Sequence, residues 1–171
     1  MSIWWTLHLR REAASVPLAR RLLAGAMETA GVDPETSWEI SLALSEACAN
    51  AVEHGGHATG DEDGSYRVTA HLDGERCRIE VTDTGPGFPE ERPEPPGRAV
   101  RDEAVPAGGG RARRRPEPRR AEEHAEGGRG LFLIEALADH VRVGNRPGSG
   151  AVVAFDKIVK WRDDALLAAT A

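Results

Sequence analysis

Hydrophobic and polar residues alternate, fully or nearly so, along five short stretches of the chain. Such alternation predicts β-strands with one buried face. Asp73-Gly74-Glu75 separates the second stretch from the third, and a segment rich in glycine and proline separates the last two, so both pairs are predicted to be β-hairpins. The five predicted strands are 3–9, 66–72, 76–83, 140–145 and 151–158.

Apolar residues recur at helical spacing in three other stretches, 12–30, 35–54 and 130–139. Gly31 ends the first predicted helix, Asp33 supplies an N-cap for the second, and Gly55 follows the second. The order strand, helix, helix, hairpin, helix, hairpin favours an α/β two-layer sandwich. In that fold class a mostly antiparallel or mixed sheet carries its helices on one face.

Residues 89–126 differ from the rest of the chain in composition. They hold seven prolines, nine arginines and nine acidic residues, and their only large apolar side chains are Val100 and Val105. Such a segment buries too little apolar surface to offset its ordering entropy, so we predict a disordered or mobile lid insertion within one domain, 1–171. The alternative is a linker between two domains. It is disfavoured because residues 131–171 contain only a helix, two strands and a tail.

Composition narrows the classes of protein that the chain can represent. Its 171 residues and 18.4 kDa suit one domain, and a formal net charge of −6 disfavours a nucleic-acid coat or a basic membrane-surface module. No apolar stretch approaches the ~20 residues of a membrane span. Cys48 and Cys77 allow at most one disulfide. A soluble, cytoplasmic protein in a reducing compartment is therefore expected.

Candidate chemistry lies first on the second predicted helix. Steps of about 100° per residue gather its polar side chains into one stripe. A solvated helix face is the simple interpretation of such a stripe. However, Glu46 and Asn50, four residues apart, also offer a carboxylate that accepts a proton and a neutral oxygen suited to Mg²⁺. The stripe consists of Glu39, Glu46, Asn50, Glu53 and His54.

Two glycine-rich motifs flank the segment 89–126. In the first, Asp83 closes a predicted strand and Gly85 and Gly87 follow, so a buried carboxylate could accept from an amino group such as that of adenine. In the second, Gly128-Arg129-Gly130 directly precedes a predicted helix, whose free N–H groups could hold phosphate. An ordinary turn and a flexible hinge are the respective alternatives. Together the motifs make the segment between them a candidate lid over a phosphate chain.

Four motifs in order carry a family resemblance: Glu46-Ala-Cys-Ala-Asn50, Asp83-Thr-Gly-Pro-Gly-Phe88, Gly128-Arg-Gly-Leu131 and Gly150-Ala151. The chain resembles the GHKL-type (histidine-kinase-like) ATPase domain. Within that superfamily it is most similar to the free-standing bacterial anti-sigma factor serine kinases.

The resemblance implies ATP and Mg²⁺ as cofactors. It assigns Glu46 as the general base, Asn50 as the Mg²⁺ ligand and Asp83 as the residue that binds the adenine amino group. It places the further nucleotide contacts at Gly85, Gly87, Gly128, Arg129, Gly130 and Leu131. The family usually has threonine after the last glycine, with its hydroxyl supporting the aspartate. Ala151 stands there, so we expect that hydroxyl contact to be missing.

The function implied is that of an ATP-dependent protein serine/threonine kinase. It would phosphorylate a small anti-sigma-factor antagonist and sequester a sigma factor. A homodimer is expected by analogy, and neither nucleic acid nor membrane is an expected partner. Trp4 and Trp5 must point to opposite faces of one strand, so one of them is expected to face outward. It marks either a dimer or sigma-factor surface or a partly covered position on an edge strand. The alternative function is a nucleotide-responsive binding module of the same fold with little or no kinase activity.

Overall fold

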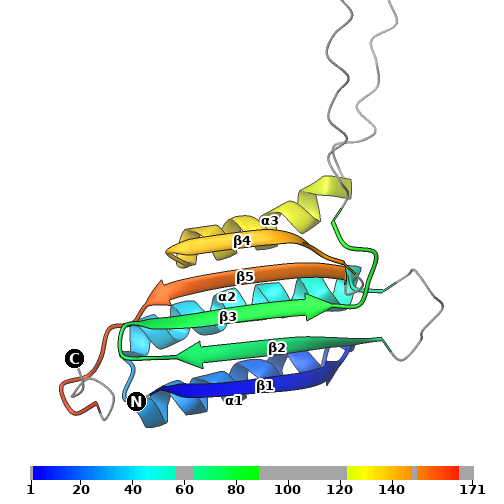
Figure 1. Ribbon diagram of the computed structural model, residues 1–171. Coiled ribbons are helices and arrows are strands. Elements are labelled where there is room, and N and C mark those ends of the chain that lie inside the picture. The colour runs from blue at the N-terminus through cyan, green and yellow to red at the C-terminus, as the bar shows by residue number, and fades with distance from the viewer. Residues whose placement is uncertain (1, 57–63, 89–122, 148–149, 166–171) are drawn as a thin grey trace, which may run out of the picture.

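The computed structural model describes residues 2–56, 64–88, 123–147 and 150–165. These residues form eight elements, the helices α1 to α3 and the strands β1 to β5 (Figure 1). Most of the predicted lid, residues 89–122, lies outside the described residues. In chain order the elements are β1 (Ile3–Arg10), α1 (Ser15–Ala30), α2 (Pro34–His54), β2 (Ser65–Leu72), β3 (Arg76–Asp83), α3 (Glu123–Leu137), β4 (His140–Arg146) and β5 (Gly150–Ile158).

The strands form one five-stranded sheet in the order β1-β2-β3-β5-β4, and every neighbouring pair is antiparallel. Both predicted hairpins, β2–β3 and β4–β5, are present. The helices lie together on one face of this sheet (Figure 1). The predicted fold class, a two-layer α/β sandwich, is therefore confirmed. The two tryptophans of β1 diverge as expected, since Trp4 is 67% exposed and Trp5 packs against the core.

The element ends follow local chemistry that the sequence displays. Gly31 ends α1 in the left-handed region at φ 88°, where a side chain would be strained. The carboxylate of Asp33 accepts hydrogen bonds from the N–H groups of Glu35 and Thr36, each at 3.1 Å, and so caps α2. In the β2–β3 turn, Asp73 accepts from the N–H groups of Glu75 and Arg76 at 2.8 and 2.7 Å.

The core lies between the helices and the covered face of the sheet. Leu44 of α2, Met27 of α1 and Ile134 of α3 are fully buried there, opposite Val68 and Ile79 of the sheet. Burial at about 25 cal/mol per Å² of apolar surface makes this layer the main source of stability. Among the described residues no helix is long and apolar enough to cross a membrane.

Both cysteines are buried and free, so they form no disulfide with each other. Burial raises the pKa of the Cys48 thiol to about 12, opposed by its hydrogen bond with Tyr66. Burial likewise raises the pKa of Cys77 to about 12, with a smaller contribution from the charge of Asp73. Both thiols therefore remain protonated at neutral pH and behave as small apolar side chains.

The start of α3 corrects one prediction. The helix begins at Glu123, seven residues before the expected start at 130, so it includes the last residues of the segment predicted to be disordered. Gly127 and Gly128 lie inside the helix and not in a loop before it, and Gly130 also lies within the helix and not at its start. Glycine in a helix costs roughly 1 kcal/mol relative to alanine. The packing of Gly130, described below, gives a reason for tolerating that cost.

Candidate nucleotide-binding site

Asp83, at the end of β3, is buried and held by backbone groups. Only 5% of its surface is exposed. Its Oδ1 accepts hydrogen bonds from the N–H of Gly85 at 2.9 Å and from the N–H of Ala151 at 3.0 Å. No residue in the described part of the chain donates to its Oδ2. One carboxylate oxygen is therefore fixed and the other is available to an external donor.

The contact with Ala151 qualifies the expectation drawn from the missing threonine. The alanine side chain provides no hydroxyl, as expected, but its main-chain N–H supports the same carboxylate. A backbone donor is independent of side-chain type, so sequence reasoning missed it. Asp83 therefore still accepts a hydrogen bond from residue 151, although threonine is absent there.

The backbone around Asp83 is packed too tightly for side chains. Gly150 has φ +83°, and a Cβ there would lie 2.5 Å from Oδ1 of Asp83 and 2.6 Å from the carbonyl oxygen of Gly85. A Cβ on Gly85 would lie 2.5 Å from the carbonyl carbon of Gly55, which directly follows α2. These glycines let β3, β5 and the end of α2 meet. Gly55 was predicted only as a helix stop, and its close approach to Gly85 was not foreseen.

Glu46 and Asn50 lie on the C-terminal half of α2, facing α3. Both are half-buried. A Cβ on Gly130 of α3 would lie 3.2 Å from Oε2 of Glu46 and 3.2 Å from Oδ1 of Asn50. The helix backbone at Gly130 therefore passes directly over both side chains. The structure brings together three residues that the sequence placed in two separate motifs.

The two groups of residues are arranged along the end of α2. A Cβ on Gly55 would lie 3.0 Å from the Cβ of Asp83, which places Asp83 at the C-terminal end of the helix. Glu46 precedes Gly55 by nine residues, or about 13 Å along a helix axis. An elongated ligand could therefore contact Asp83 at one end and Glu46 with Asn50 at the other.

The remaining predicted site residues differ in their surroundings. Arg129 is exposed on α3, and Leu131 is half-buried and packs against the core. Gly87 adopts φ +81° in the loop after Asp83. Gly128 lies in the first half of α3, as corrected above.

The other polar residues of the α2 stripe pair elsewhere. Oε2 of Glu39 lies 2.7 Å from Nζ of Lys157, which also donates to the carbonyl oxygen of Leu137 at 2.6 Å. At the exposed end of α2, Nε2 of His54 lies 3.8 Å from Oε2 of Glu53. Among the residues that the structure describes, no group of three or more His, Cys, Asp or Glu side chains could hold a metal ion.

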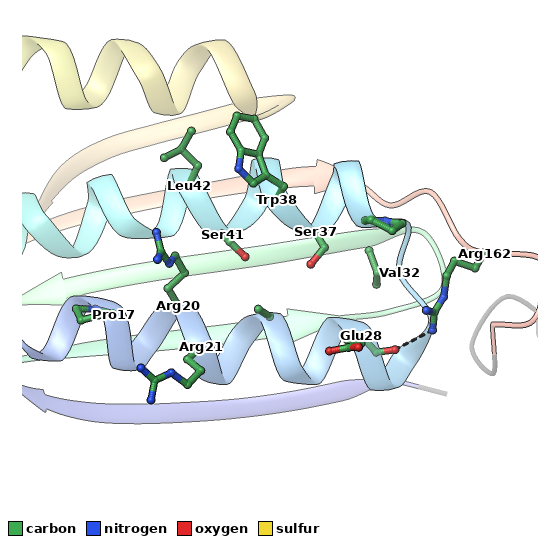
Figure 2. Close-up of a pocket in the computed structure, with 12 residues that line it drawn as sticks. Pro17, Arg20, Arg21, Glu28, Val32, Ser37, Trp38, Ser41, Leu42 and Arg162 are labelled. Atoms are coloured by element: carbon green, nitrogen blue, oxygen red, sulfur yellow. Dashed lines mark hydrogen bonds between the residues drawn. The ribbon is translucent and has the colours of Figure 1, made fainter.

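A separate groove of about 630 Å³ lies between α1 and the N-terminal half of α2 (Figure 2). Its walls include Arg20 and Arg21 of α1 and Trp38, which is 62% exposed. Ser41 also lines it, and its Oγ is buried without a hydrogen-bond partner in the described structure. Glu46 and Asn50 do not belong to this groove, so it is distinct from the candidate nucleotide site.

Comparison with known proteins identifies the class. The profile of the family described as the histidine kinase-like ATPase domain matches residues 9–157, so the chain belongs to that family. It is similar to the serine-protein kinase RsbW of Listeria innocua, with 32% identity over 142 residues that cover 81% of this chain and 77% of that one. It is also 31% identical to the serine-protein kinase RsbW of Halalkalibacterium halodurans over 149 residues, 87% of this chain and 78% of that one.

A solved structure supports the fold. The crystal structure of the RsbU and RsbW domains of a Mycobacterium tuberculosis protein matches with a TM-score of 0.57 and 22% identity, covering 91% of this chain and 33% of that chain. The sequence relatives confirm the resemblance stated from the four motifs. They also give the class of enzyme, a protein serine/threonine kinase with a histidine-kinase-like ATPase domain.

Proposed function

We propose that this protein transfers the γ-phosphoryl group of ATP to a serine or threonine of a small anti-sigma-factor antagonist, and that it also sequesters a sigma factor. The observation that carries the proposal is the meeting of Glu46, Asn50 and Gly130, with Asp83 further along α2 at its C-terminal end. A cytoplasmic location and a homodimer belong to this proposal as well.

The proposed role of Asp83 is adenine recognition. Its Oδ1 is occupied by two backbone N–H groups, so Oδ2 remains to accept from the adenine amino group. A carboxylate held by backbone donors in a buried place is preorganised, and binding need not order it. Gly85 and Gly87 would shape the adenine side. Gly128, Arg129, Gly130 and Leu131 would lie toward the phosphates.

The proposed role of Glu46 is general base. Its carboxylate would take the proton of the attacking hydroxyl as the new O–P bond forms and ADP leaves. The side-chain oxygen of Asn50 is a neutral, hard ligand of the kind that Mg²⁺ accepts together with phosphate oxygens and water. Magnesium, when bound, would offset the charge of the phosphates. Gly130 fits this arrangement because any side chain there would crowd both groups.

Two substitutions test the proposal. Asp83→Asn should abolish Mg-ATP binding measured by calorimetry, because the amide replaces a carboxylate that accepts at both oxygens. Glu46→Gln should keep ATP binding and lose transfer from γ-labelled ATP to an antagonist from the same source. Arg78→Ala, an exposed change on β3, serves as the control and should alter neither.

The outcomes separate the proposal from its alternative. If Glu46→Gln retains full phosphoryl transfer, the base assignment is wrong. If the unaltered protein binds ATP but transfers no phosphoryl group, and Glu46→Gln regulates the partner as before, the nucleotide-responsive binding module replaces the kinase.

A further inference from the structure

Asn145, near the end of β4, holds the far end of the loop that begins at Asp83. Its Oδ1 accepts from the N–H of Phe88 at 2.7 Å, and its Nδ2 donates to the carbonyl oxygen of the same residue at 2.8 Å. Both halves of the amide are thus paired with both backbone groups of one residue. Nothing in the four motifs or in their spacing points to this side chain.

Gly87 shows how closely this amide approaches the loop. Its φ is +81°, and a Cβ there would lie 2.4 Å from Oδ1 of Asn145. The loop is therefore fixed at two places: Asp83 binds the N–H of Gly85, and Asn145 binds the backbone of Phe88. Gly85 and Gly87 are the residues that the proposed function places beside adenine: Gly85 is the first of these points, and Gly87 lies between the two.

The β4–β5 ladder connects the two attachments. Asn145 pairs with Ala151 in the register of that hairpin, and Ala151 is the residue whose N–H supports Asp83. One rung of the sheet thus carries a contact to each end of the loop. A displacement of the Asn145–Ala151 pair would therefore move the Asp83 carboxylate and the backbone of residues 85–88 together.

We propose that Asn145 is a positioning residue for nucleotide binding: it holds residues 85–88 in the conformation that leaves Oδ2 of Asp83 open to the adenine. This inference rests on the proposed function. Asn145 and its two hydrogen bonds to the Phe88 backbone are exposed, although the Phe88 side chain packs against the core. Water can replace exposed hydrogen bonds when they are lost, so the amide contributes little to global stability. The effect of the Asn145 amide is local: it sets the conformation of the loop that is proposed to contact adenine.

The test compares Asn145→Ala with Arg142→Ala, a control on the same strand whose side chain is exposed and makes no hydrogen bond or ion pair within the described residues. Loss of both hydrogen bonds should weaken Mg-ATP binding by roughly 5- to 30-fold. Mg-ADP should lose the same factor because the adenine side is common to both. In phosphoryl transfer, KM for ATP should rise while kcat stays near its original value. The melting temperature without nucleotide should match that of the control.

A second variant guards against a folding defect. Asn145→Asp keeps the acceptor for the N–H of Phe88 but faces its carbonyl oxygen with a carboxylate, so it should fold and still bind both nucleotides less tightly. Binding of ATP within twofold of the original by both variants would overturn the inference. A loss for ATP without a loss for ADP would overturn it as well. The inference would fall with the proposed function if the unaltered protein bound no ATP, whereas normal binding by Asn145→Ala would remove the inference alone.

Discussion

The candidate nucleotide site and the groove between α1 and α2 are built in different ways, although α2 contributes to both. Around Asp83 the contacts are made by backbone, and a Cβ added to Gly85 or Gly150 would overlap its neighbours. The groove is lined by side chains, and Ser41 within it has a buried hydroxyl without a partner in the described structure. The backbone around Asp83 is closely packed, whereas the groove is an open space of about 630 Å³. Substitutions should therefore be costly in the first and tolerated in the second.

Among substitutions that test this contrast, the largest effect is expected from Gly150→Ala. The backbone there has φ +83°, and the added Cβ would lie 2.5 Å from Oδ1 of Asp83. The strain and the displaced carboxylate should weaken ATP binding roughly 100-fold, or about 3 kcal/mol. Calorimetry with Mg-ATP measures this. Gly144→Ala on β4 is the matched control, because a Cβ there meets nothing within 4 Å. If both variants bound ATP equally well, the close packing around Asp83 would not be required for nucleotide binding.

A smaller effect is expected from Gly130→Ala, which should lower the rate of phosphoryl transfer but raise stability. The new methyl would lie 3.2 Å from oxygens of Glu46 and Asn50 and should displace them by a few tenths of an ångström. Phosphoryl transfer should fall about tenfold, since misplacement of 1 Å can cost 100-fold. The free energy of unfolding should rise by about 0.5–1 kcal/mol, because alanine favours the helix.

Gly25→Ala in α1 is the control for that experiment. It is also a helical glycine, but a Cβ there meets nothing within 4 Å. It should give the same gain in urea stability with no change in phosphoryl transfer. Equal activity of the two variants would show that the space over Glu46 and Asn50 is not needed for the reaction.

The same contrast explains what the sequence could predict. Strands, hairpins and caps followed from the pattern of apolar residues and from side chains such as Asp33, because these effects are local. The start of α3 was predicted seven residues too late because Gly127 and Gly128 disfavour a helix by their conformational cost, whereas the structure includes both of them in α3. The N–H of Ala151 was missed because almost every residue type has a backbone donor. The amide of Asn145 was missed because a single surface asparagine belongs to no recurring sequence pattern.

The smallest effect on nucleotide binding is expected in the groove. Ser41→Ala removes a hydroxyl that is buried without a partner in the described structure, and burial of such a group costs free energy. Alanine also favours the helix by a few tenths of a kcal/mol, so Ser37→Ala, half-buried in the same groove, is needed as the matched control. The free energy of unfolding in urea should rise about 1 kcal/mol more for Ser41→Ala than for Ser37→Ala. ATP binding should be unchanged in both. Equal increases in the free energy of unfolding would mean that water in the groove forms a hydrogen bond with the Ser41 hydroxyl. The contrast with the fully hydrogen-bonded Oδ1 of Asp83 would then be lost.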